Sequence, residues 1–232
     1  MSIGQKHFAE ECIEAGAVIA WHRHSAPYAA VILSGTLDET SESGRRKLRP
    51  GDVAIHAAYE AHADRINGED VTIVNIPLGG GFTVDARSGR LDDMGVFLKL
   101  QSAGDMSKTA EWLFRNIQIT DDGPADLPDV LACDLAEGNT HSIGAWARER
   151  GVRAETVSRQ FRKAYGLSPK QFRAAVRARS VLKKIASATA PLSEIALQAG
   201  YADQAHMIRA IVAMTGRTPG AWRRSTGFNP AA

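Results

Sequence analysis

The stretch SEIALQAGYADQAHMIRAIVAMTGRTP, residues 193–219, decides the character of the C-terminal part of this chain. Its apolar residues recur at helical spacing on both sides of a break at Gly200. Asp203 stands where it can cap the second helix, and Met207 and Ile211, four residues apart, mark the buried face of that helix. Two helices joined by a tight turn with glycine have the geometry of a DNA-binding helix-turn-helix unit.

A second unit of the same kind precedes this stretch. Residues 142–166 predict two short helices separated at Gly151, with Phe161 on the buried face of the second. A capping box, Ser168-Pro169-Lys170-Gln171, then opens one long helix that joins the two units. Two units held by a rigid helix can enter successive major grooves on one face of DNA.

The charge of the chain is distributed unevenly. Residues 141–232 hold 16 Lys and Arg against 4 Asp and Glu, a net charge of +12. Residues 1–83 hold 7 against 11, a net of −4, and residues 84–140 hold 5 against 11, a net of −6. Such asymmetry indicates a polyanionic partner for the C-terminal part alone, although a solvated basic surface without a partner gives the same count.

The C-terminal residues resemble the DNA-binding domain of AraC/XylS-type transcriptional regulators over residues 142–224. The matching segments are FRKAYGLSP at 161–169, SEIA at 193–196, GYADQAH at 200–206 and TGRTP at 215–219. The resemblance implies seven helices, with recognition helices at about 154–164 and 204–214. Several positions depart from the family pattern, namely Arg153 in place of a small N-cap residue, Ile211 in place of phenylalanine, and Val212-Ala213 in place of basic residues.

The resemblance also implies which residues contact DNA. The groove-facing residues are Glu155, Ser158 and Arg159 in the first recognition helix, with Arg162 nearer the DNA backbone, and Gln204, His206 and Arg209 in the second. Arg159 and Arg209 have the chemistry to pair with guanine O6 and N7, Gln204 with adenine, and Glu155 with cytosine N4. Each side chain could instead be solvated or contact phosphate, since phosphate and sugar take half or more of protein–DNA hydrogen bonds.

The N-terminal part predicts short strands separated by turns and resembles a cupin β-barrel. Gly16, His22-Arg23-His24, Tyr28 and Gly35 have the spacing of the first cupin motif, and Pro50-Gly51-Asp52 with His62 fits the second. Tyr28 stands where a glutamate ligand is usual, and Ala57, Tyr59 and Ile66 also depart from the pattern.

Three histidines form a candidate metal site. His22 and His24 lie two residues apart and therefore face the same side of a strand. With His62 they offer three nitrogen ligands suited to a divalent transition metal: zinc, nickel, copper or iron. Alternatively, His22, His24, Tyr28 and His62 line a metal-free pocket for an organic effector. His56 is expected to be structural or exposed, on the opposite face from His62.

The sequence predicts an α+β multidomain chain. Its domains are a cupin-like sensor barrel at 1–83, a helical linker at 84–138, and an all-α double helix-turn-helix DNA-binding domain at 139–232. In the linker, Phe97, Leu98, Trp112 and Phe114 provide enough apolar surface for a dimer interface, although they could pack on their own barrel instead. Family precedent favours the homodimer.

These observations together predict a sequence-specific transcriptional regulator. Its expected partners are a double-stranded DNA operator, a small-molecule or metal effector and, for an activator, RNA polymerase; no catalytic residue is assigned. A metal-dependent cupin enzyme with an appended DNA-binding domain is the alternative, and an architectural DNA binder is a third. No apolar run approaches 18 residues, so no membrane span is predicted, and two cysteines, Cys12 and Cys133, favour a reducing cytoplasm.

Overall fold

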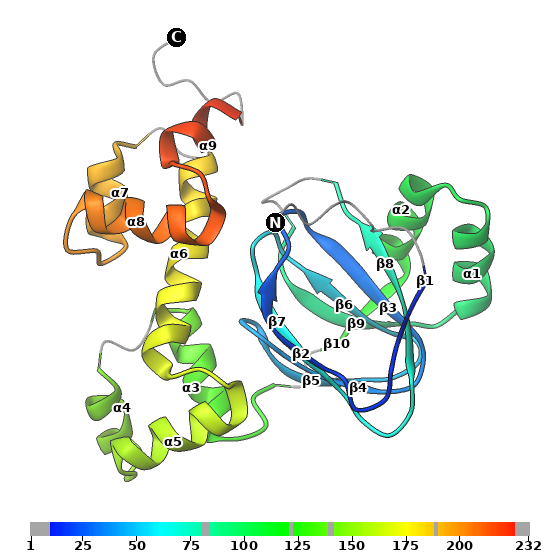
Figure 1. Ribbon diagram of the computed structural model, residues 1–232, viewed down its shortest axis with the longest axis horizontal. Helices are drawn as coiled ribbons and strands as arrows, with labels where there is room; N and C mark the ends of the chain where they lie inside the picture. Colours follow the sequence, from blue (N-terminus) through cyan, green and yellow to red (C-terminus); the bar gives the residue numbers. More distant parts are fainter. Residues whose placement is uncertain (1–9, 80–83, 121–122, 139–141, 188–189, 226–232) are drawn as a thin grey trace. The chain divides into compact units, whose positions relative to one another are not determined.

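The chain divides into two compact units, Met1–Ala125 and Asp126–Ala232. The computed structural model describes residues 10–79, 84–120, 123–138, 142–187 and 190–225. Unit 1 is rich in strands and unit 2 is entirely helical (Figure 1). The predicted α+β class, a strand-rich part followed by a helical part, is therefore confirmed.

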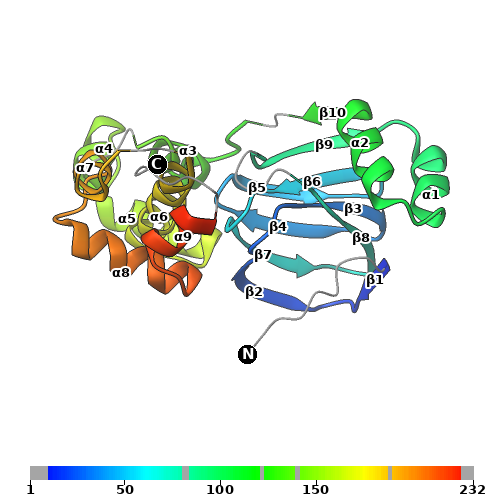
Figure 2. The same cartoon turned by 90° about the horizontal axis from the view of Figure 1, so that it is seen from above.

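Unit 1 contains two antiparallel sheets. The six-stranded sheet has the order β1 (Glu10–Ile13), β8 (Val71–Pro77), β3 (Tyr28–Ser34), β6 (Asp52–His56), β9 (Arg87–Leu91), β10 (Ile117–Thr120). The four-stranded sheet has the order β2 (Val18–Arg23), β7 (Ala61–Ile66), β4 (Leu37–Ser41), β5 (Gly44–Leu48). Figure 2 shows the strands wrapped around a common interior.

The central strand β3 explains how the six-stranded sheet is buried on both faces. Its side chains alternate between faces, as the two-residue period of a strand requires. Ala29 and Val31 are fully buried in a cluster with residues of the flanking helices, whereas Ala30 and Ile32 belong to a second cluster between the two sheets. A strand buried on both faces needs a nearly continuous apolar sequence, which AAVIL provides.

Two helices cover the outer face of the six-stranded sheet. These are α1 (Met94–Ser102) and α2 (Met106–Asn116), which lie together on one side of unit 1 in both views (Figures 1 and 2). Phe97 and Leu113 are fully buried against the sheet, and Trp112 packs on the same cluster. Leu98 and Phe114 are exposed. The apolar surface predicted for a dimer interface is thus divided evenly: Phe97 and Trp112 pack on the chain's own sheet, and Leu98 and Phe114 are exposed.

Residues 84–138 are not the helical linker that the sequence predicts. They contain β9 and β10, which extend the six-stranded sheet, as well as α1 and α2. Gly89 permits this pairing, because a Cβ at that position would meet the backbone oxygen of Gln118 at 2.5 Å. The helical periodicity of α1 and α2 was recognised in the sequence, but the short strands on either side of them carry too few apolar residues to be recognised.

Unit 2 contains seven helices within the described residues, the number that the resemblance implies, but one of them, α3, lies before the predicted domain at 139–232. They are α3 (Leu127–Ala136), α4 (Ile143–Glu149), α5 (Ala154–Tyr165), α6 (Pro169–Ser187), α7 (Leu192–Gln198), α8 (Gln204–Thr215) and α9 (Pro219–Ser225). The pairs α4–α5 and α7–α8 are the two helix-turn-helix units. The 19-residue helix α6 runs between them (Figure 1) and spans roughly 28 Å at 1.5 Å per residue.

Helix α3 belongs to unit 2, so the predicted boundary near residue 138 lies too late in the chain. Asp129 accepts a buried hydrogen bond of 2.8 Å from the hydroxyl of Tyr165 in α5. Asp134 accepts one of 2.6 Å from the indole N–H of Trp146 in α4 and pairs with Arg150 at 3.1 Å. With α3 included, unit 2 holds 16 Lys and Arg against 8 Asp and Glu, a net charge of +8.

The second helix of each helix-turn-helix unit, α5 or α8, begins and ends at residues that the sequence predicts. Asp203 caps α8 by accepting a hydrogen bond of 2.6 Å from the backbone N–H of His206. Arg153 occupies the N-cap of α5 and makes no such side-chain bond, as its departure from the family pattern suggests. Gly166 and Gly216 end the two helices in the left-handed conformation, with φ of 69° and 70°.

Candidate functional site

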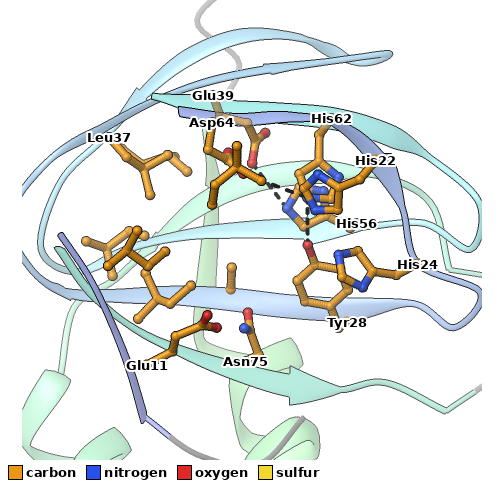
Figure 3. A pocket seen from close by; sticks show the side chains of 16 residues that line it. Glu11, His22, His24, Tyr28, Leu37, Glu39, His56, His62, Asp64 and Asn75 are labelled. Atoms are coloured by element: carbon orange, nitrogen blue, oxygen red, sulfur yellow. Dashed lines mark hydrogen bonds and ion pairs between the residues drawn. The ribbon is translucent and has the colours of Figure 1, made fainter. Parts of the chain in front are cut away.

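A cavity of about 390 Å³ lies between the two sheets of unit 1 (Figure 3). Side chains from eight strands line it, because every second residue of each strand faces the interior. The lining residues are Glu11, Ile13, Ile19, His22, His24, Tyr28, Ala30, Ile32, Leu37, Glu39, Leu48, His56, His62, Asp64, Ile73 and Asn75. The cavity size falls within the range of small-molecule sites.

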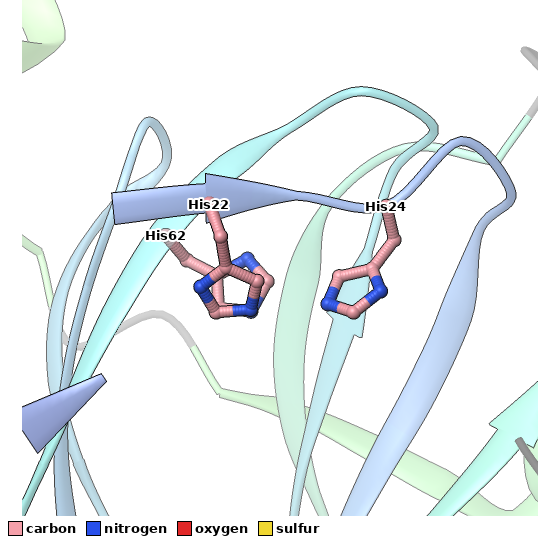
Figure 4. A group of neighbouring side chains, drawn as sticks. All are labelled: His22, His24 and His62. Carbon is pink, nitrogen blue, oxygen red and sulfur yellow. The ribbon is translucent and has the colours of Figure 1, made fainter. Parts of the chain in front are cut away.

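The structure brings the four residues predicted for the sensor pocket together at one end of this cavity. One ligand atom from each of His22, His24 and His62 lies within 4.8 Å of the others (Figure 4). The rings of His22 and His62 have centroids 4.1 Å apart, and those of His24 and Tyr28 are 4.7 Å apart. The hydroxyl of Tyr28 is hydrogen-bonded to Nε2 of His62 at 2.9 Å.

The donor chemistry of the three histidines fits a divalent transition metal. Nδ1 of His22 lies 3.0 Å from the backbone oxygen of Ala20, so Nδ1 carries the proton and Nε2 keeps its lone pair. His62 has a buried Nδ1 with no hydrogen-bond partner. Burial, followed by the positive charge of His56, lowers the pKa of His62 to about 2, so its imidazole is neutral. Neutral imidazoles are the form that binds metal.

His56 is part of the site, which corrects the expectation that it is structural or exposed. It is 3% exposed, lines the cavity, and its ring stacks on that of His62 with centroids 4.2 Å apart. The expected placement on opposite faces is wrong even for a single strand, because residues six apart share a face. The two histidines lie on different strands: β6 ends at His56, a turn with Tyr59 at φ 58° reverses the chain, and β7 brings His62 back from the facing sheet.

A buried ion-pair network, which the sequence does not predict, supports this end of the cavity. Glu39 pairs with Nε2 of His56 at 3.1 Å and with Arg46 at 3.3 Å, and its side chain is 2% exposed. Burial alone would raise the pKa of Glu39, but His56 and then Arg46 lower it to about 2. Burial alone would lower the pKa of His56, but Glu39 raises it, helped by Glu60. The pair is therefore ionised at neutral pH.

The alternation of side chains along β4 is the sequence signal that places Glu39 in the interior. Leu37, Glu39 and Ser41 share one face of that strand and are all buried. Asp64 enters the cavity in the same way, two residues after His62 on β7. Burial, reinforced by Glu39, raises the pKa of Asp64 to about 7. The pKa of Tyr28 is raised well above its usual value by burial and by nearby carboxylates, so its hydroxyl is protonated.

The other end of the cavity is apolar. Its side chains come from both sheets and include Ile13, Ile19, Ile32, Leu37, Leu48 and Ile73. Figure 3 shows Leu37 and its neighbours at the end opposite the histidines, with Glu11 and Asn75 on one wall and Glu39 and Asp64 on the other. A ligand of this cavity therefore needs an apolar body and a polar end.

In unit 2, the residues predicted to face DNA lie on the exposed side of their helices. In α5, Glu155, Arg159 and Arg162 are exposed and Ser158 is half-buried, while Val157 and Phe161 are buried. In α8, Gln204, His206 and Arg209 are exposed, while Met207 and Ile211 are buried. Each helix thus presents a polar face with one central arginine, a geometry that allows entry into a major groove.

Comparison with protein families identifies the C-terminal part. A family model described as a helix-turn-helix domain matches residues 146–225. These residues form a helix-turn-helix domain, and the resemblance noted in the sequence is confirmed for them. None of the curated proteins compared matches the chain. No described helix is long and apolar enough to cross a membrane.

Solved structures show only distant similarity. The first example is ToxT from Vibrio cholerae O395 bound to (E)-4-(8-methylnaphthalen-1-yl)but-3-enoic acid, 9% identical over 94% of this chain and 97% of that one, with a TM-score of 0.42. Another is the C-terminal domain of AraT, a response regulator from Geobacillus stearothermophilus, 19% identical over 44% and 87% of the two chains, with a TM-score of 0.41. KdgF from Halomonas sp. is 22% identical over 28% and 61%, with a TM-score of 0.26.

Proposed function

We propose that this chain, whose residues 146–225 form a helix-turn-helix domain of the AraC type, is a sequence-specific transcriptional regulator that senses a ligand in the cavity of unit 1. The observation that carries the proposal is the pair of exposed helix faces, on α5 and α8, joined by α6. The length of α6, roughly 28 Å, is close to one turn of DNA at about 34 Å. The two faces can therefore contact adjacent major grooves.

The test of this proposal is the selection of bound sequences from a random pool of duplex DNA by the full-length chain. Two short conserved elements, with centres about 10 base pairs apart, are expected to be enriched. The affinity for the selected DNA should fall steeply with salt, because several phosphate contacts release counterions. If no sequence is enriched and binding depends on salt alone, the chain is a non-specific binder and the proposal is wrong.

Unit 1 supplies the sensor in this proposal. Its cavity separates a cluster of imidazoles and a phenol from an aliphatic end, an arrangement that positions one end of a small ligand and encloses the other. The operator, the effector and a second copy of the chain are its proposed partners, with RNA polymerase as a further partner if the regulator is an activator.

The histidine cluster supports a second element of the proposal, a zinc, nickel, copper or iron ion held by His22, His24 and His62. Such an ion would supply a Lewis-acidic centre for an oxygen or nitrogen atom of the ligand. Tyr28 replaces the usual fourth, anionic ligand and holds His62 in place through its hydroxyl.

The metal content of the chain, purified without a histidine tag or chelator, tests this element. We expect about one metal ion per chain and at least a tenfold loss of Zn²⁺ affinity in His62→Ala, because one of three ligands is removed. His206→Ala, which removes an exposed histidine of unit 2, is the matched control and should bind as wild type does. Equal Zn²⁺ affinity in wild type and His62→Ala would show that the cluster is not a metal site.

A further inference from the structure

Carboxylates, but no lysine or arginine, are among the residues that line the cavity. Among its 16 lining residues are Glu11, Glu39 and Asp64, but neither lysine nor arginine. His56 and Arg46 offset Glu39 through their ion pairs. Asp64 lies 4.0 Å from Nε2 of His62, and Glu11 lies on the opposite wall of the cavity (Figure 3). A carboxylate or phosphate ligand would therefore meet the Glu11 carboxylate with no arginine or lysine among the lining residues to pair with.

Glu11 and Asn75 form an acceptor pair on one wall. Glu11 lies opposite Ile73 in the register of β1 and β8, so Asn75, two residues further along β8, is its diagonal neighbour on the same face. The side-chain oxygen of Asn75 is buried and has no hydrogen-bond partner. Glu11 is itself exposed, and among the described residues no hydrogen bond or ion pair engages its carboxylate. The buried oxygen of Asn75 and the solvated carboxylate of Glu11 can therefore both accept hydrogen bonds from a ligand of the cavity.

The aliphatic side chains define the other half of the ligand. Ile13 follows Glu11 by two residues on β1 and faces the same interior, and Ile32 and Ile73 lie nearby on β3 and β8. A group that donates hydrogen bonds to Glu11 and Asn75 can therefore place an attached carbon body among these side chains. The cavity volume of about 390 Å³ suits a ligand of small-molecule size.

We propose that the cavity binds a small organic cation, a protonated amine with an apolar body, whose ammonium group donates hydrogen bonds to Glu11 and Asn75. This inference rests on the proposed sensor function and specifies the chemical class of its ligand.

Isothermal titration calorimetry of the full-length chain tests the inference. The probes are 2-phenylethylamine, isopentylamine, 2-phenylethanol and 3-phenylpropionate, titrated in EDTA so that metal at the histidines does not contribute. We expect 2-phenylethylamine to bind at least tenfold more tightly than 3-phenylpropionate, with the neutral alcohol between them. The ammonium gains a charge-assisted hydrogen bond, whereas the carboxylate is repelled.

Matched variants locate the ammonium group. Glu11→Gln should weaken 2-phenylethylamine about tenfold and leave 2-phenylethanol unchanged, since it removes the charge and retains the shape. Glu10→Gln removes the neighbouring exposed carboxylate, which does not line the cavity, and should change neither affinity. Tighter binding of the carboxylate, no binding of either amine, or an unchanged amine affinity in Glu11→Gln would each overturn the inference.

The outcome is separable from that of the proposed regulatory function. The titration reports on the cavity without DNA, and selection from the random pool reports on α5 and α8 without a ligand. Amine binding by a chain that enriches no DNA sequence would support this inference and reject the regulator. Enrichment of a DNA sequence by a chain whose cavity binds neither amine would support the regulator and reject this inference.

Discussion

Replacement of Arg159 and Arg209 together by alanine is expected to abolish sequence-specific DNA binding while leaving the fold intact. Both side chains are exposed at the centres of the polar faces of α5 and α8, and neither packs in the core of unit 2. A bidentate contact from arginine to guanine contributes about 1–3 kcal/mol of discrimination. Loss of two such contacts should weaken binding to the selected operator by about 30-fold to 10⁴-fold.

Fluorescence anisotropy with labelled operator duplex, at fixed salt concentration, measures this effect. The control is Lys47→Ala with Lys99→Ala, which removes the same charge from exposed positions of unit 1. Because unit 1 is not expected to touch DNA, the control should lose little affinity. The assignment of α5 and α8 as recognition helices would be wrong if the arginine variant lost no more affinity than the lysine variant.

Replacement of Glu39 by glutamine should destabilise unit 1 by about 3 kcal/mol. Glu39 is buried between His56 and Arg46, so the variant leaves two cationic groups without their shared carboxylate. The fall of the Glu39 pKa from 4.5 to about 2 on folding corresponds to about 3 kcal/mol. Because the folded-state pKa is the lower one, this stability is present above pH 4.5 and is lost as the pH falls toward 2.

Hydrogen–deuterium exchange in β4 and β6, measured between pH 7 and pH 2, distinguishes this loss from changes in unit 2. Asp38→Asn is the matched control, because Asp38 is the neighbour of Glu39 on β4 and lies on the opposite face. We expect fast exchange in Glu39→Gln at pH 7 and near-native exchange in Asp38→Asn. Equal protection in the two variants would mean that the Glu39 network does not stabilise the sheets.

The residues that begin and end the helices of unit 2 allow its fold to be predicted from the sequence in detail. Capping residues and C-terminal glycines act locally, so α5 and α8 lie where their sequence signals place them. The close approach that permits β9 and β10 to pair depends on Gly89 facing Gln118, two positions far apart in the chain. No local pattern reports such a contact, and residues 84–138 were assigned to a linker for that reason.

In the candidate site of unit 1, too, some residues are predictable from local sequence patterns and others depend on tertiary contacts. His22, His24, Tyr28 and His62 were found because their spacing follows a motif that local strand geometry explains. His56, in contrast, belongs to neither motif, and a chain reversal brings it beside His62 from the other sheet, a contact that only the tertiary structure reveals. The pairing of Glu39 with His56 joins β4 of one sheet to β6 of the other, and only the tertiary structure brings these residues together.

The contacts of helix α3 determine where the helical unit must begin if it is joined to another protein. Its carboxylates Asp129 and Asp134 hold the side chains of Tyr165, Trp146 and Arg150 in the first helix-turn-helix unit. A recombination event that joined the chain after α3 would separate these donors from their acceptors. A fragment that keeps these contacts must therefore begin no later than Asp126, so the acidic helix α3 belongs with the two basic helix-turn-helix units.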